Sequence, residues 1–354
     1  MEGNPSSVHT AGRAARELLD RARAQVAQAL SAAPADIVFT SGATEAAALA
    51  VRGALGAAGG ERRELVVTEV EHPCVRALAQ GLAAAGQPVR WVPVDREGIP
   101  DLGALRQAVS ERTALVCGMA ANNETGVVLP VREMASEARN AGALFFCDAV
   151  QAVGKQELDV STLGADLVAF TGRKLGGPPG AGGLWIRPGI PLAPLLGGHQ
   201  ERGRRAGTEN LPGVVGLGAA LAAAMEKRAE EQARVGALRE ALERGVLARI
   251  PRAKVNGIGA RRLAGTSSLT LPGCDGEALL IALDLEGICV SAGSACTSGS
   301  TTPSHVLSAM GLTPVEARAT LRFSLGWSST PGDVEGLLAV LPGLVERVRA
   351  AIPM

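Results

Sequence analysis

Runs of apolar residues alternate with amphipathic stretches through the first two-thirds of the chain. Several of these runs lack the in/out alternation of a half-exposed strand, which is typical of strands covered on both faces. We predict strands at 37–40, 65–68, 89–92, 114–119, 143–147, 167–170 and 183–186. We predict helices between them at 45–55, 74–85, 102–110 and 131–141. This β-α-β order predicts an α/β fold with a doubly wound, mostly parallel seven-stranded sheet, in which ligands bind at the carboxyl ends of the strands.

The pattern changes after about residue 213. A small-residue helix at 213–225 runs into a charged amphipathic helix at 226–250. Shorter strands are predicted near 267–271 and 288–291, and helices near 277–285, 315–320 and 333–349. We therefore predict a large domain at 1–225 and a smaller α+β domain at 226–354. The segment 291–304 has eight Ser or Thr residues among fourteen and no charge, which predicts a mobile loop.

Composition narrows the class of protein. The 354 residues are 47% hydrophobic and carry 35 Lys+Arg against 35 Asp+Glu, which excludes a disordered chain and gives no basic excess for nucleic acid. No apolar stretch is long enough to span a bilayer, and no signal peptide is visible. The six cysteines contain no CxxC pair, and no His/Cys/Asp cluster has metal-site spacing. We expect a cytoplasmic protein that holds no metal.

Three features at predicted strand ends could carry chemistry. The segment 40–45, Thr-Ser-Gly-Ala-Thr-Glu, joins a strand to a helix and suits a phosphate, although an ordinary capped helix start explains it equally well. Asp148 ends a very apolar strand, and Lys174 follows another strand and precedes a Gly/Pro-rich turn. Taken alone, Asp148 is explained as well by a capping or turn residue, and Lys174 by a solvated loop lysine. Together they provide an amine, a carboxylate and a phosphate cradle, the set that pyridoxal phosphate requires.

Several further motifs make the chain resemble the cysteine desulfurases, which are class V members of the fold-type I pyridoxal-phosphate enzymes. The motifs that carry the resemblance are Phe-Thr-Ser-Gly-Ala-Thr-Glu at 39–45, Glu-His at 71–72, Asn-Asn-Glu-Thr-Gly at 122–126, Cys-Asp-Ala-Val-Gln at 147–151, Gly-Arg-Arg-Ala-Gly-Thr-Glu-Asn at 203–210, Ser-Ala-Cys-Thr-Ser at 294–298 and Arg-Phe-Ser at 322–324. The resemblance runs nearly the whole length of the chain. The form of the cysteine motif resembles that of the iron–sulfur assembly and nitrogen-fixation branch.

The resemblance implies pyridoxal 5'-phosphate as the cofactor and a large domain that binds it. Lys174 would bind its aldehyde covalently and later move the substrate's α-proton. Asp148 would keep the ring nitrogen protonated, and His72 would stack on the ring and act as acid/base. The other cofactor-binding positions that the resemblance implies are Ala43, Thr44, Asn123, Gln151, Thr171, Arg173 and Thr208. Thr208 would reach in from the second subunit of a homodimer.

The resemblance also implies the substrate and the nucleophile. Arg322 and Asn123 would hold L-cysteine, the guanidinium gripping its carboxylate. Cys296, in the mobile loop of the small domain, would attack the sulfur, release L-alanine and carry a persulfide. A sulfur-acceptor or iron–sulfur scaffold protein, or a tRNA-thiolation pathway, would receive that sulfur. The other cysteines carry no such signal: Cys117 and Cys147 are predicted core residues, and Cys74, Cys274 and Cys289 match no functional motif.

Two departures from the family pattern keep other readings open. Arg173 stands where the family usually has histidine, and the chain begins at Met1 where family members begin well upstream. A catalytically impaired scaffold that lacks the usual N-terminal segment is therefore one alternative. A selenocysteine lyase or another class V aminotransferase-like enzyme is a second, although transamination needs no protein thiol. Neither a membrane nor a nucleic acid is an expected partner.

Overall fold

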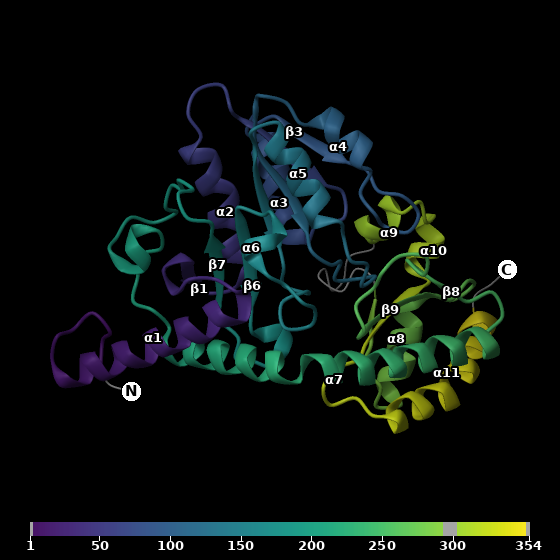
Figure 1. The fold of residues 1–354 in the computed structure, drawn as a ribbon. Coiled ribbons are helices and arrows are strands. Elements are labelled where there is room, and N and C mark those ends of the chain that lie inside the picture. The colour runs from purple at the N-terminus through teal and green to yellow at the C-terminus, as the bar shows by residue number, and fades with distance from the viewer. Residues whose placement is uncertain (1–2, 293–302, 352–354) are drawn as a thin grey trace. The chain divides into compact units, whose positions relative to one another are not determined.

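The computed structural model describes residues 3–292 and 303–351, which form two compact units (Figure 1). The N-terminal unit contains the chain up to Val92, together with Asp101–Ala121 and Leu129–Arg228. The C-terminal unit contains Pro93–Pro100, Asn122–Val128 and the chain from Ala229 onward. Two short segments from the first half of the sequence therefore belong to the second unit.

The N-terminal unit is built on a seven-stranded sheet, as predicted. Its strand order is β1-β7-β6-β5-β4-β2-β3, and β7 runs antiparallel to both neighbours while the other six strands run parallel to one another. The strands are β1 (Ile37–Thr40), β2 (Glu64–Thr68), β3 (Val89–Val92), β4 (Thr113–Met119), β5 (Leu144–Asp148), β6 (Leu167–Thr171) and β7 (Gly182–Ile186). All but β3 are buried along their whole length or nearly so, which is why their apolar runs do not alternate.

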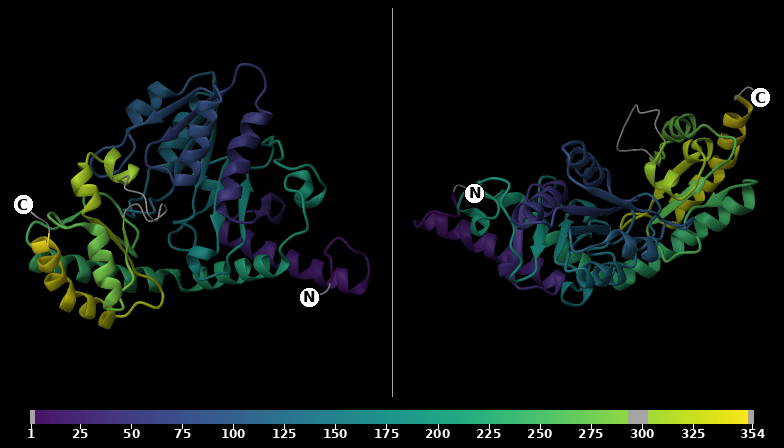
Figure 2. Two further views of the ribbon diagram at one scale, coloured as in Figure 1. Left: turned by 180° about the vertical axis from the view of Figure 1, so that it is seen from behind. Right: turned by 90° about the horizontal axis from the view of Figure 1, so that it is seen from above.

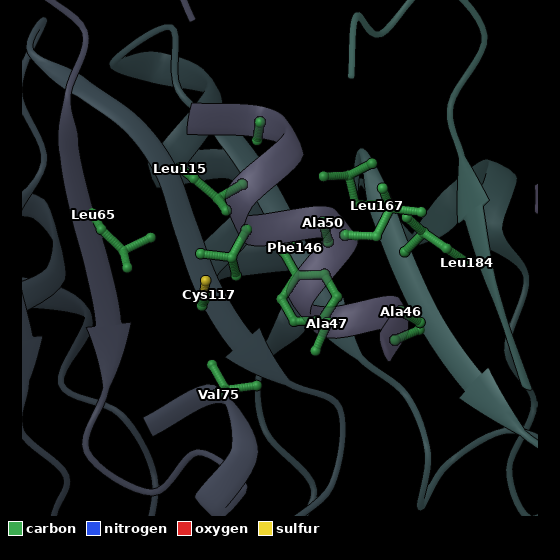
Figure 3. Close-up of a cluster of buried hydrophobic side chains, with 14 of the residues drawn as sticks. Ala46, Ala47, Ala50, Leu65, Val75, Leu115, Cys117, Phe146, Leu167 and Leu184 are labelled. Atoms are coloured by element: carbon green, nitrogen blue, oxygen red, sulfur yellow. The ribbon is translucent and has the colours of Figure 1, made fainter. Parts of the chain in front are cut away.

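Helices cover both faces of this sheet. On one face α2 (Ala43–Ala57) presents Ala46, Ala47 and Ala50 to strand side chains that include Leu115 and Phe146 (Figure 3). These small side chains allow the helix to approach the sheet closely. On the other face Met134 of α5 (Val131–Asn140) lies against Gly118, where a Cβ would come within 3.0 Å of the Met134 methyl carbon. The remaining helices of the unit are α1 (Thr10–Leu30), α3 (Pro73–Ala84), α4 (Leu102–Ala108) and α6 (Val160–Leu163), with short 3₁₀ turns at Pro34–Asp36, Arg173–Leu175 and Gln200–Gly203.

The C-terminal unit has an antiparallel four-stranded sheet in the order β10-β11-β9-β8. Its strands are β8 (Lys254–Val255), β9 (Thr266–Thr270), β10 (Ser291–Ala292) and β11 (Thr320–Ser324), and its helices are α8 (Gly276–Leu285), α9 (His305–Ala309), α10 (Pro314–Arg318) and α11 (Pro331–Ala351). Leu269, Leu321 and Phe323 form a core with α8, α11 and the second half of α7 (Leu211–Arg249). The ribbon of this unit is seen from two further sides in Figure 2. The opposite sheet face is polar, because Thr320, Arg322 and Ser324 of β11 pair there with Thr270, Ser268 and Thr266 of β9.

Three expectations about elements need correction. The two stretches at 213–250 form one uninterrupted helix, α7, so the predicted domain boundary at 225/226 falls inside a helix. Strand β10 begins at Ser291, and 288–290 are not in a strand. The predicted helix at 315–320 ends at Arg318, because Thr320 begins a strand that pairs with β9. No helix among the described residues is long and apolar enough to cross a membrane.

Candidate active site

The predicted cofactor-binding residues of the N-terminal unit follow the carboxyl ends of parallel strands. Ala43 and Thr44 follow β1, Lys174 follows β6, Asp148 ends β5, and His72 follows β2. Since these strands run parallel, their carboxyl ends lie on the same edge of the sheet, where doubly wound folds bind their ligands. The topology therefore gathers residues that are up to 131 positions apart in the sequence, by the difference between 174 and 43.

The first turn of α2 offers backbone N–H groups at this edge. No described residue comes within 4 Å of the position that a Cβ on Gly42 would occupy, so this part of the structure leaves the backbone there open to a ligand. Glu45, which could repel an anion, is engaged elsewhere: it accepts the Ser41 amide at 2.7 Å and pairs with Arg205 at 2.7 Å. Burial alone would raise the pKa of Glu45, but the hydrogen bonds from Arg205 and Ser41 outweigh it and lower the pKa. The turn is suited to a phosphate.

Asp148 is a buried carboxylate. Its one hydrogen bond from a described residue is donated by the backbone amide of Val150 at 3.0 Å, and no cation pairs with it there. Burial raises the pKa of Asp148 from 3.8 to about 6. Glu71, deeper in the unit, accepts from Thr68 at 2.8 Å and from the amide of Met119 at 2.7 Å. Burial, and then the charge of Asp148, raise the pKa of Glu71 to about 8, so a single negative charge on this pair is favoured near neutral pH.

His72 caps the N-terminus of α3, and its ring contacts a cysteine that the sequence analysis passed over. The ring Nδ1 accepts the Cys74 amide at 3.2 Å and lies 3.0 Å from the Cys74 sulfur. Burial, followed by the positive charge of Lys174, lowers the pKa of His72. A cysteine two positions after a candidate catalytic histidine was the signal that could have drawn attention to Cys74.

Lys174 lies in the short 3₁₀ turn Arg173–Leu175 and is exposed, as is Arg173. The turn ends at Gly176, whose φ of 82° is a conformation that favours glycine. Thr171, at the end of β6, is buried, donates to the carbonyl of Ala181 and accepts the amide of Arg173. Its hydroxyl therefore holds the turn that carries the lysine.

The two other predicted cofactor contacts of this unit are placed differently. The side-chain oxygen of Gln151 accepts from Lys155 at 2.9 Å, four positions further along the chain, so this oxygen already has a partner. Thr208 is exposed. The segment before it is anchored by the Arg205–Glu45 ion pair and by the hydrogen bond from the Gly207 amide to the Gln200 side chain. The side chain of Thr208 is thus accessible at the surface of this unit.

The C-terminal unit holds both residues predicted to bind substrate. Arg322 lies on the polar face of the small sheet, donates to the Asn123 carbonyl at 3.0 Å and donates to the Ser291 hydroxyl at 3.1 Å. The Arg322 Nε and the Asn123 Oδ1 are buried and have no hydrogen-bond partner among the described residues. A buried donor and acceptor without partners cost free energy unless something binds them. They are suited to a ligand with a carboxylate and an amine.

A second hydrogen-bonded pair in this unit, Ser304 and Glu124, includes a residue that follows the cysteine motif in the sequence. The Ser304 hydroxyl donates to Glu124 at 2.5 Å and also accepts the Leu307 amide, which caps α9. Burial raises the pKa of Glu124 from 4.5 to about 7, against the smaller opposing effects of Ser304 and Arg322. Cys296 itself lies outside the described residues, as does the rest of 293–302. The chain is thus hydrogen-bonded to the rest of the C-terminal unit at Ser291, before that stretch, and at Ser304, after it.

Glu124→Gln is expected to stabilise the C-terminal unit at pH 8 and to change it little at pH 5. The folded pKa of Glu124 lies above its unfolded value, so wild-type stability falls as the pH rises from about 4.5 to about 7. Glutamine removes that loss, on the order of 3 kcal/mol, and can still accept from Ser304. Urea unfolding at the two pH values measures the change. Glu335→Gln, at an exposed position of α11, is the control, and an unchanged pH dependence in Glu124→Gln would contradict the prediction.

Comparison with known proteins defines the family. The family model for aminotransferase class V matches residues 1–337, and the chain belongs to this family. Among its relatives is "Cysteine desulfurase" from Cereibacter sphaeroides, which is 47% identical over 99% of this chain and 90% of its own length. "Cysteine desulfurase 2" from Trichormus variabilis is 45% identical over 99% of this chain and 88% of its own length.

Solved structures agree with these relatives. A structure titled "NIFS-LIKE PROTEIN" superposes with a TM-score of 0.90 at 34% identity, covering 98% of this chain and 92% of its own. A NifS-like protein from Rickettsia africae superposes with a TM-score of 0.87 at 30% identity, with the same coverage of both chains. The resemblance seen in the sequence and the predicted α/β fold class are confirmed.

Proposed function

We propose that this protein is a pyridoxal-phosphate-dependent L-cysteine desulfurase. The family and the relatives named cysteine desulfurase support the reaction class. The observation that carries the proposal lies at one sheet edge: Asp148 is a buried carboxylate with no cation beside it among the described residues, and Lys174 is an exposed lysine that follows the adjacent strand. A protonated ring nitrogen would balance the Asp148 charge, and the lysine would supply the amine for an aldehyde.

The residues of the N-terminal unit fit the cofactor. Asp148 would hold the ring nitrogen, Lys174 the aldehyde, and the first-turn amides of Ala43 and Thr44 the phosphate, beside the open backbone at Gly42. When bound, pyridoxal phosphate withdraws electrons from the substrate and makes cleavage of its carbon–sulfur bond possible. The further contacts proposed are Gln151, Thr171, Arg173 and Thr208. Gln151 would contribute through its NH2 group, because its side-chain oxygen accepts from Lys155.

Substrate binding is assigned to Arg322 and Asn123, whose buried polar atoms need a ligand. The guanidinium, held at the Asn123 carbonyl and Ser291, would take the substrate carboxylate. His72 and Lys174 would move protons. The low pKa of His72 keeps its ring neutral near pH 7, so that it can take up a proton when one is released.

Sulfur transfer to Cys296 completes the reaction. The Cys296 sulfur forms a bond to the substrate sulfur, the carbon–sulfur bond of L-cysteine breaks, and the substrate carbon takes a proton. One thiol and one cysteine yield one persulfide and one alanine, so the step balances without an external oxidant. The persulfide would then pass to an acceptor protein for iron–sulfur cluster assembly or tRNA thiolation.

We propose a cytoplasmic homodimer in which Thr208 of one subunit contributes to the cofactor site of the other; its exposure leaves it available. The cofactor-binding domain would end at about residue 225, and the smaller domain would carry the cysteine loop 291–304. The acceptor protein is defined by its chemistry alone, as one with a thiol that can receive a persulfide sulfur.

Product analysis tests the function. Protein loaded with pyridoxal phosphate and given L-cysteine and a thiol reductant is expected to form alanine and sulfide in equal amounts, with no pyruvate and no need for a keto acid. Without reductant, mass spectrometry should find one extra sulfur atom on the peptide that contains Cys296. The peptide with Cys289, an exposed cysteine seven positions earlier, provides the internal control.

Other outcomes select other functions. Alanine formation only from selenocysteine would favour a selenocysteine lyase, and a requirement for a keto acid would favour an aminotransferase. A folded, yellow protein that forms no alanine would indicate a scaffold, the outcome that Arg173 would favour. Extra sulfur on Cys289 in place of Cys296 would overturn the assignment of the nucleophile.

A further inference from the structure

The imidazole of His72 is held at one of its two nitrogens by the start of α3. The helix begins with Pro73, which has no amide hydrogen, so the first amide that needs an acceptor is that of Cys74. This amide donates to His72 Nδ1 at 3.2 Å. Only an unprotonated ring nitrogen can accept it, so the cap itself favours the tautomer with its proton on Nε2.

The Cys74 side chain reinforces the same arrangement. Its sulfur lies 3.0 Å from Nδ1, so a single residue approaches this nitrogen with two donors, the amide and the thiol. Burial, and then the charges of Asp148 and Glu71, raise the pKa of Cys74 to about 12, against the smaller effect of the Thr44 hydroxyl. The thiol therefore keeps its proton at neutral pH and donates it. The reverse pair, a thiolate beside an imidazolium, is disfavoured because Lys174 and burial also lower the pKa of His72.

We propose that Cys74 is a positioning residue for His72: its amide and thiol together keep Nδ1 an acceptor, so that the ring proton stays on Nε2. The meaning of this for catalysis rests on the proposed function. His72 then meets bound substrate or cofactor as a neutral hydrogen-bond donor through Nε2. It can take up a proton at Nδ1 only by giving up both bonds from Cys74, which makes the N-terminus of α3 part of the proton-transfer step.

Nitrogen-15 NMR of the histidine rings in the holoenzyme tests this directly. The chain has four histidines, His9, His72, His199 and His305, and a His72→Asn variant identifies the signal in question. Wild type is expected to show His72 as the Nε2–H tautomer. Cys74→Ala removes one of the two donors, so a mixture of tautomers and a rise of the His72 pKa by about 0.5–1 are expected. Cys74→Ser retains a donor and should restore the wild-type spectrum, and Cys289→Ala serves as the matched cysteine control.

Three results would overturn the inference: an Nδ1–H tautomer in wild type, an unchanged spectrum in Cys74→Ala, or a serine variant that behaves as alanine does. None of these readouts needs turnover, so the inference and the proposed function fail separately. If the protein forms alanine, the acid limb of the kcat profile should move upward with the His72 pKa in Cys74→Ala and return in Cys74→Ser. A loss of activity without that movement would mean a merely structural role.

Discussion

Asp148→Asn is expected to slow alanine formation from L-cysteine by on the order of 10²–10³-fold, while making the cofactor-free protein more stable at pH 8. Asparagine has the shape of aspartate and can still accept the Val150 amide. It carries no charge, however, and would not hold a protonated ring nitrogen. The predicted cost is therefore electrostatic, with the geometry retained.

The gain in stability follows from the sign of the pKa shift. The folded pKa of Asp148, about 6, lies above the ordinary value of 3.8, so ionisation is more difficult in the folded protein. Stability therefore falls as the pH rises through this interval, and the whole penalty is present above pH 6. Asparagine removes the penalty, which is on the order of 3 kcal/mol. Glu71, whose pKa the Asp148 charge raises, should then ionise at a lower pH.

Thermal unfolding of the cofactor-free proteins at pH 5 and pH 8 measures the change in stability, and alanine release measures the change in activity. The Asn variant should have the higher Tm at pH 8, and its advantage over wild type should fall to about half at pH 5, which lies midway between the unfolded and folded pKa values. Asp20→Asn, at an exposed position of α1, is the control and should change neither quantity. An Asn variant that is less stable at pH 8, or that keeps full activity, would contradict the role assigned to Asp148.

Glu201→Gln is expected to destabilise the N-terminal unit by about 3–5 kcal/mol. The Glu201 side chain is 1% exposed and receives two bonds from Arg23, at 2.6 and 2.9 Å, and one from the Phe39 amide at 2.9 Å. Arg23 is itself buried, donates to the Ile37 carbonyl and lies 4.5 Å from the centre of the Phe39 ring. A neutral partner would leave the guanidinium charge buried and uncompensated.

Removing both charges separates this effect from ordinary packing. The double variant Arg23→Met with Glu201→Gln should recover a substantial part of the stability, because no unpaired charge is left in the interior. Glu17→Gln breaks the exposed Glu17–Arg21 pair of the same helix and should change the urea midpoint little. A double variant as unstable as the sum of the two single variants would mean that the charges act independently.

The sequence alone was enough for the fold class and for most of the sheet. The strands at 37–40 and 89–92 have the predicted bounds, and the others differ by a residue at one or both ends. Buried parallel strands produce uninterrupted apolar runs between Gly- and Pro-marked turns, a signal that is local and strong. The same kind of local signal marked the segment 40–45 and the positions of Asp148 and Lys174 at strand ends.

The elements that the sequence analysis missed have weaker local signals. Helix α1 went unpredicted, because much of its buried stripe is alanine, as at Ala15, Ala22 and Ala27. The boundary near Thr320 was misplaced, since pairing with β9 overrides a helix-like pattern. Cys74 was dismissed although it is only two residues from His72, because its importance depends on how the helix begins.

Only the tertiary structure decided which residues, distant in the sequence, form hydrogen bonds with one another. Glu201 lies 178 positions from Arg23, and Ser304 lies 180 positions from Glu124, yet each pair shares a buried hydrogen bond. It also decided which buried groups have no hydrogen-bond partner within residues 3–292 and 303–351, such as the Arg322 Nε and the Asn123 Oδ1. The periodicity of apolar residues indicates which positions are buried, and it can be recognised within a short stretch of sequence. Pairing and pKa depend on what the fold brings within a few ångströms, and that depends on the whole chain.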